Sequence, residues 1–275
     1  MTTSLTGANS GIAASPFDIL CALGEGVSLN AQQCFPLSLA DKVVVLRDGM
    51  LAIDAMPAKG KLQVLDFLMA GDVVSSLKVL SARKVSLRAI TRSHAVILHP
   101  LDLAPAALPP ECWRLLVEQG FNQVARVNLH QMMTGRLETE ARVASFLLAL
   151  ALRHAGGAPD DERRPVVVPL PMSRVDIANY LVINCDTLSR TMMKFSDAGM
   201  IERVSRHAVV VKDLPALQRK SPIASLLADV VTRLNAERSD VFRSGAGTGP
   251  SAPASERERE GKFDRRTRAA LSAAQ

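Results

Sequence analysis

The chain has 275 residues, which is enough for two compact domains and additional segments. Lysine and arginine outnumber aspartate and glutamate by 33 to 27, and the resulting net charge of +6 favours a polyanionic partner such as nucleic acid. The four cysteines (Cys21, Cys34, Cys112 and Cys185) are too widely spaced for a disulfide framework. The first twenty residues lack a basic start followed by an apolar core, so we expect a cytoplasmic protein without a secretory signal.

Residues 20–109 are rich in short alternating segments typical of β-strands, after a stretch at 1–19 that we expect to be flexible. Residues 42–53 predict a hairpin with Asp48-Gly49 at its turn. Residues 62–69 alternate and end near Gly71, and residues 84–91 and 94–99 predict two more short strands. A β domain is therefore expected over 20–109.

Residues 110–137 predict one long helix with a continuous apolar stripe. Apolar or small residues recur at spacings of three and four: Trp113, Leu116, Val117, Gly120, Phe121, Val124 and Val127. Such a stripe either is buried against the chain's own β domain or pairs with a second copy of the helix. The length of ~40 Å exceeds what one small domain usually covers, which favours pairing.

Residues 172–200 predict two helices joined by a tight turn. Val175, Ile177, Ala178 and Leu181 of the first helix, and Leu188, Met192 and Phe195 of the second, are expected to face inward. Asp186, Ser189 and Arg190 then share the outer face of the second helix at i, i+3 and i+4. That geometry suits insertion into a DNA major groove, where arginine bonds a guanine edge and an acid accepts from cytosine.

The segments after the second helix extend the pattern. Residues 201–211 predict a hairpin with Ser205-Arg206 at its turn, a wing that would bring Arg203, Arg206 and His207 near phosphates. Residues 214–243 contain a further amphipathic helix whose docking site the sequence does not reveal. Residues 244–275 combine Gly, Ser, Ala and Pro with runs of charge, and we expect them to be disordered.

Three short motifs, Ser173-Arg174, Asp176-Ile177-Ala178 and Asp186-Thr187-Leu188-Ser189-Arg190, resemble the helix-turn-helix of the CRP/FNR transcription regulators. The resemblance is greatest to the FNR/FixK branch, whose recognition helix carries Glu-x-x-Ser-Arg. Here Asp186 replaces the glutamate, and Val182 stands in the turn where the family usually has glycine. The resemblance implies an α+β fold: an N-terminal β-roll (a cyclic-nucleotide-binding-like jelly roll), a long dimerisation helix at 110–137, and a winged helix-turn-helix at 138–213.

The resemblance also implies a function and its residues. A homodimer paired through Trp113, Val117, Phe121, Val124 and Val127 would bind double-stranded DNA at a TTGAT-N4-ATCAA-like pseudo-palindrome, and an activator would also contact RNA polymerase. Asp186, Ser189 and Arg190 would read bases. The DNA backbone would be contacted by Ser173, Arg174, Thr187, Lys194, Arg203 and Arg206.

No cofactor or metal is predicted, and the sequence identifies no effector. Cyclic-nucleotide-binding members hold the ribose with a Gly-Glu-x-x-Leu run, but residues 72–88 contain no glutamate, although Arg83 or Lys84 could meet a phosphate. An iron–sulfur cluster needs four convergent thiolates, which these cysteines do not supply. No pair stands out among the candidate haem ligands, His94, His99, His130 and Cys112.

Cys185 is a candidate redox switch, because it begins the DNA-reading helix and its oxidation would add bulk, and at the sulfinic stage charge, beside phosphates. Two alternatives remain open: a ligand- or haem-gated regulator of the same family, and a protein-interaction module with weak DNA binding. No enzyme or membrane protein is expected. The chain shows no nucleophile–base pair and no phosphate-binding glycine loop, and its longest apolar helical segment is far shorter than the ~20 residues that span a bilayer.

Overall fold

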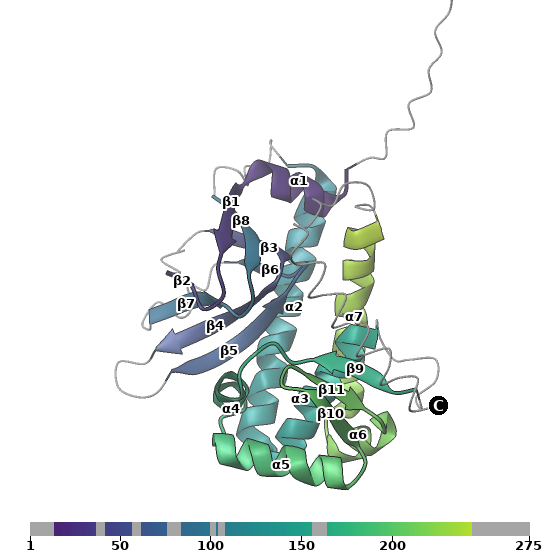
Figure 1. Cartoon of the computed structure of the whole chain (residues 1–275). Helices are drawn as coiled ribbons and strands as arrows, with labels where there is room; N and C mark the ends of the chain where they lie inside the picture. The colour runs from purple at the N-terminus through teal and green to yellow at the C-terminus, as the bar shows by residue number, and fades with distance from the viewer. Residues whose placement is uncertain are drawn as a thin grey trace, which may run out of the picture.

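The computed structural model describes residues 14–36, 42–56, 62–75, 84–99, 103, 108–155 and 164–243, with side chains up to 235. The expectations for residues 1–13 and 244–275, and for Arg83, lie outside this part of the chain. A β-rich domain and a helix-rich domain lie at opposite ends of one long helix, α2 (Figure 1). Within the described residues, no helix is long and apolar enough to cross a membrane.

The N-terminal domain is a β-roll of two antiparallel four-stranded sheets, as predicted. One sheet has the order β1-β8-β3-β6 and the other β2-β7-β4-β5. Leu46, Leu51, Leu68 and Leu87 are fully buried in the core between the sheets. The strands are β1 Glu25–Leu29, β2 Cys34–Pro36, β3 Val43–Asp48, β4 Met50–Met56, β5 Gln63–Met69, β6 Val73–Ser75, β7 Lys84–Ala89 and β8 Ser93–Leu98.

The hairpin predicted for residues 42–53 is wrong. The chain does reverse at Asp48-Gly49, but β3 pairs with β6 and β8, whereas β4 pairs with β5 and β7 in the other sheet. Gly49 has φ 88°, and a Cβ there would lie 2.5 Å from the backbone oxygen of Arg92. This turn is therefore a corner between sheets that only glycine fits.

Helix α1 (Pro16–Leu23) includes the end of the stretch expected to be flexible. Ser15 caps it by accepting a hydrogen bond from the backbone N–H of Asp18. Phe17 and Leu20 pack with Cys112 and Leu115 at the start of α2. The cap and this apolar cluster order the residues just before the β-roll.

Helix α2 (Pro110–Arg136) buries several polar side chains and exposes several apolar ones, the reverse of the usual amphipathic helix. Its buried face includes Gln119, Asn122, Arg126 and His130. Its exposed face carries Val117, Phe121, Val124 and Val127, with Phe121 71% exposed. The predicted stripe is thus split, because Trp113 and Leu116 pack partly buried against the α1 cluster.

The C-terminal domain is a winged helix-turn-helix, as predicted, and the strand β9 was not foreseen. The wing strands β10 and β11 pair antiparallel with Ile201 opposite Val211, and β9 pairs with the other edge of β11. Leu147, Leu188 and Phe195 are buried at the centre. The elements are α3 Thr139–Ala155, β9 Val166–Pro169, α4 Arg174–Leu181, α5 Cys185–Asp197, β10 Ile201–Ser205, β11 Ala208–Val211 and α6 Leu214–Lys220.

The segment expected as one extra helix at 214–243 contains two, α6 and α7 (Ala224–Arg243). Helix α7 runs alongside α2 and away from the wing (Figure 1). Leu227, Val231 and Leu234 are buried against the core of the DNA-binding domain, and Asn235 Nδ2 donates to the Leu152 carbonyl over 3.0 Å. This helix is an integral part of the packing.

Contacts of α4 with the β-roll and with α2 help to hold the DNA-binding domain in place. Arg88 on β7 donates from Nε to Asp54 Oδ2 over 2.6 Å and from Nη2 to Asp176 Oδ1 over 2.7 Å, which links the sheet to α4. Nearby, Tyr180 of α4 stacks on His130 of α2 with ring centroids 4.3 Å apart. His130 Nε2 also donates to the Tyr180 carbonyl over 2.7 Å.

We predict that Arg88→Ala lowers the free energy of unfolding by about 3 kcal/mol, because it leaves two buried carboxylates without their cation. Asp54 is only 2% exposed. In thermal unfolding this corresponds to roughly 6–12 °C for a protein of this size. Lys212→Ala is the control: it breaks an exposed ion pair with Glu202 and should cost less than ~1 kcal/mol. Equal losses for the two variants would contradict the role given to Arg88.

Candidate nucleic-acid interface

The first helix of the motif, α4, is started by a capping box. Ser173 Oγ accepts from the backbone N–H of Asp176, and the Asp176 carboxylate accepts from the backbone N–H of Ser173 over 3.0 Å. This reciprocal pair satisfies two amides at the helix start. Asp176 is thus engaged twice, by the cap and by Arg88.

The turn after α4 keeps a left-handed residue although glycine is replaced. Val182 has φ 54° and ψ 50°, and its side chain is 53% exposed. Arg142 of α3 donates from Nη1 to the carbonyl of Leu181 over 3.2 Å and from Nε to the carbonyl of Leu137 over 2.8 Å. These bonds anchor the turn against the domain core.

Helix α5 presents the three predicted base-reading side chains to solvent. Asp186, Ser189 and Arg190 are exposed, while Leu188 and Phe195 on the opposite face are buried. Met192 is half-buried, as expected. Val175 was wrongly assigned to the core of α4: it is exposed, because Ile177, Ala178 and Leu181 occupy the inner face.

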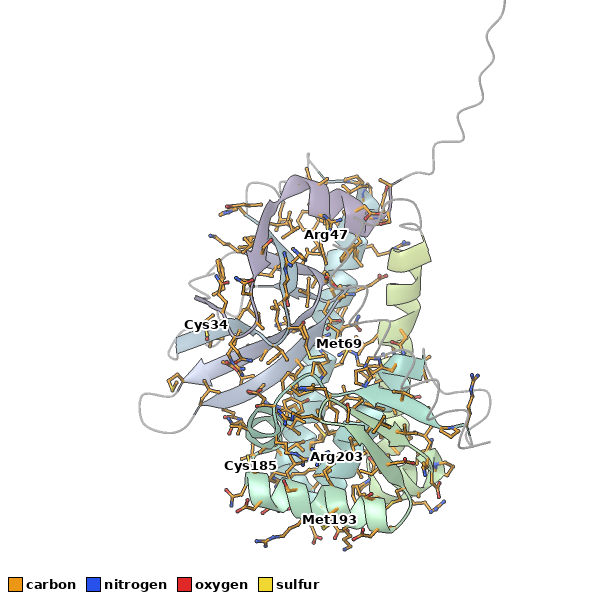
Figure 2. The ribbon with its side chains drawn as sticks, in the orientation of Figure 1. Cys34, Arg47, Met69, Cys185, Met193 and Arg203 are labelled. Carbon is orange, nitrogen blue, oxygen red and sulfur yellow. The ribbon has the colours of Figure 1, made fainter. Side chains whose placement is uncertain are left out.

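Positive side chains gather beside α5. Arg174 Nη1 lies 3.4 Å from Ser189 Oγ. Burial and the neighbouring Arg203 charge both lower the pKa of Arg174. A cation whose pKa is lowered by a neighbouring like charge is stabilised by an incoming anion. Figure 2 shows Cys185, Met193 and Arg203 together at the end of the molecule opposite α1.

The remaining residues predicted to contact the DNA backbone differ in their exposure and in the protein partners that they already have. Ser173 is occupied by the cap, although it remains exposed. Lys194 forms an ion pair with Glu140 at the start of α3. Thr187 is half-buried in the first turn of α5, and Arg206 is exposed at the tip of the wing beside His207. The surface formed by Arg174, Ser189, Arg190, Arg203 and Arg206 is therefore the part most open to DNA.

Sequence reasoning missed the residues that position this surface. Arg88, Arg142 and Tyr180 act through partners 34 to 88 residues away in the chain, except for the Arg142–Leu137 bond. No local spacing signals such contacts. The capping box at Ser173 and Asp176 was the one positioning element with a local signature.

Known proteins similar to this chain are helix-turn-helix regulators, in agreement with this geometry. A model described as the Crp-like helix-turn-helix domain matches residues 141–220. The nitrogen fixation regulation protein FixK of Azorhizobium caulinodans is 29% identical over 212 residues, covering 75% of this chain and 83% of that protein. The transcriptional regulatory protein btr of Bordetella pertussis is 29% identical and covers 65% and 73% of the two chains.

The structure of FixK2 from Bradyrhizobium japonicum superimposes with a TM-score of 0.59 and 22% identity, covering 72% of this chain and 97% of that one. Residues 141–220 therefore form a Crp-like helix-turn-helix domain, and the chain as a whole resembles the CRP/FNR regulators. It is a DNA-binding transcription regulator of the CRP/FNR type and not an enzyme. Helix α7 lies beyond the matched helix-turn-helix and is an addition to it.

The cysteines of this CRP/FNR-type protein lie in unlike surroundings. Burial raises the pKa of Cys21 to about 11 and also raises the pKa of Cys112. Cys34 is exposed, and Cys185 is half-buried at the start of α5. Within the described ranges, no three or more His, Cys, Asp or Glu residues gather as a metal site would require.

We predict that Val182→Gly raises the free energy of unfolding by about 1 kcal/mol, because a left-handed backbone costs an L-residue ~1–2 kcal/mol and glycine little. Denaturant unfolding monitored by circular dichroism measures the change. Val175→Gly, a matched substitution at an exposed helical position, should instead destabilise the protein by a few tenths of a kcal/mol. Destabilisation by both substitutions would show that the turn is not strained.

Proposed function

We propose that this regulator acts as a homodimer on a TTGAT-N4-ATCAA-like pseudo-palindrome. The observation that carries the proposal is the exposed trio Asp186, Ser189 and Arg190 on α5, backed by the buried Leu188 and Phe195. Arg190 offers two parallel donors to a guanine, and Asp186 accepts from a cytosine amino group. Arg174, Arg203 and Arg206 bind phosphates on either side of that helix.

The case for the homodimer rests on α2. Val117, Phe121, Val124 and Val127 lie at helical spacing on its exposed face, whereas the polar residues face the protein. A large exposed apolar stripe marks an interaction surface. A second copy of the same helix can cover this stripe, because a two-fold axis brings the same apolar residues of both copies into contact. The dimer then presents two α5 helices to successive turns of DNA.

We predict that Arg190→Ala costs about 1–3 kcal/mol in binding to the TTGAT-N4-ATCAA duplex while binding to a scrambled duplex stays unchanged. Fluorescence anisotropy at physiological salt, under reducing conditions and without added ligand, measures both. Arg47→Ala removes an exposed arginine from β3, at the end of the molecule away from α5 (Figure 2), and should leave both affinities intact. An Arg190→Ala protein that kept full discrimination would refute the base-reading role.

We predict that Phe121→Glu turns the dimer into a monomer, because it puts a charge at the centre of the apolar stripe. Sedimentation velocity should show half the mass, and affinity for the palindrome should fall because one half-site is lost. Leu226→Glu, at an exposed position of α7, should remain dimeric. A wild-type monomer, or a dimeric Phe121→Glu protein, would contradict the assigned interface.

Cys185 supports a redox modulation of the same activity. It lies in the first turn of α5, next to Asp186 and within the electrostatic influence of Arg174. We predict that peroxide weakens specific DNA binding of the wild type and that Cys185→Ser binds DNA unaffected by peroxide. Cys34→Ser, which removes the exposed cysteine of the β-roll, should retain the sensitivity. Equal peroxide responses of the two variants would exclude this switch.

The proposal needs no cyclic nucleotide and no iron–sulfur cluster. Specific binding by colourless protein without additives would separate it from a ligand- or haem-gated regulator. Equal, weak binding to both duplexes together with a copurifying protein would favour an interaction module instead. Contact with RNA polymerase follows only if the protein activates transcription.

A further inference from the structure

A cavity of about 70 Å³ lies where the β-roll, α2, the DNA-binding domain and α7 meet. Met69 at the end of β5 belongs to its wall, and Figure 2 shows that residue at the waist of the molecule. The opposite wall is α7, through Leu227, Val230, Val231 and Leu234. At ~10–15 Å³ for each water-sized group, the volume accommodates about five to seven such groups.

Two buried arginines line this cavity with unused donors. The side chain of Arg126 is 8% exposed, and its Nε donates to Asp66 Oδ2 over 2.8 Å. Its Nη1 and Nη2 have no hydrogen-bond partner. Arg153 donates from Nη2 to both oxygens of Asp72 over 3.0 Å, and its Nε also lacks a partner. Buried donors without partners cost ~1–3 kcal/mol each, so an occupant that accepts hydrogen bonds is favoured.

Two carboxylates lie beside these arginines, and both are already engaged. Asp66 lines the cavity and accepts from Arg126 Nε and from the backbone N–H of Phe67. Burial alone would raise the pKa of Asp72, but Arg153 and Arg126 hold it below its usual value, so Asp72 stays ionised and bound to Arg153. Burial raises the pKa of Tyr180, so its hydroxyl keeps its proton. The unpartnered groups of this wall are arginine N–H donors, and the occupant that complements them is a hydrogen-bond acceptor.

The rest of the cavity selects an apolar body. Eleven of the fifteen lining residues are apolar, including Phe146 and Leu150 of α3. An ordered water needs two to four polar partners, which only the arginine side of the cavity provides. Water alone would leave the α7 side poorly solvated.

We propose that this cavity binds a short-chain monocarboxylate, with its carboxylate on the free N–H groups of Arg126 and Arg153 and its alkyl chain against α7. The site lies between the domains rather than inside the β-roll. Because its walls come from β5, α2, α3, α4 and α7, an occupant stabilises one orientation of the DNA-binding domain. It is independent of the proposed DNA sequence, and its binding is measured without DNA.

The test is isothermal titration of the full chain with sodium butyrate and, at equal ionic strength, with butylammonium chloride. Butyrate should bind saturably, one molecule per chain, and butylammonium should not bind because it offers only donors. Butyrate that fails to bind up to its solubility limit, or that binds no better than butylammonium, would overturn the proposal.

Variants locate the site. Val231→Phe fills the cavity from α7 and should weaken butyrate binding by at least about tenfold. Leu226→Phe, at an exposed position of the same helix, should leave the affinity within about twofold of the wild type. Ala149→Leu fills the cavity from α3 and repeats the test should Val231→Phe not fold. Wild-type affinity in a folded cavity-filling variant would place the butyrate elsewhere and overturn the assignment.

Discussion

The bond between Arg88 and Asp176 is the contact on which the placement of the DNA-reading helices depends. Arg88 is held within its own domain by Asp54, so a rigid sheet supplies the cation. Asp176 is held within the other domain by the cap of α4. Both side chains are already held within their own domains, so the bond fixes the orientation of α4 relative to the sheet as well as their distance. The two domains are thereby coupled at α4 through one buried carboxylate, in addition to the buried pair between Arg153 of α3 and Asp72.

Helix α2 adds a second constraint, because its two faces have separate tasks. The polar face reaches both domains: Arg126 binds Asp66 of the β-roll, and His130 binds the carbonyl of Tyr180 in α4. The apolar face carries no such contacts and is left for a second copy in the proposed dimer. A change at the interface between copies would thus reach the DNA-binding domain through one rigid helix.

The sequence predicted the helix-turn-helix, the wing and the long helix well, because each has a local signature. The periodicity of Leu188 and Phe195 sufficed to orient Asp186, Ser189 and Arg190 outward. Prediction failed where tertiary partners decide the outcome. The Asp48-Gly49 turn is indistinguishable in sequence from a hairpin, although its strands join different sheets. Likewise, nothing in the local sequence indicates that Arg126 is buried, because its partners Asp66 and Asp72 come from the β-roll.

The packing of α7 determines what a truncation of the gene would do to the protein. A stop codon placed just after α6 leaves the entire matched helix-turn-helix translated, with every residue proposed to contact DNA intact. It nevertheless uncovers the apolar surface that Leu227, Val231 and Leu234 bury. Such alleles would be lost to proteolysis or aggregation rather than to a defect in DNA reading. A chain that folds must therefore extend through α7, beyond the part of the protein proposed to meet DNA.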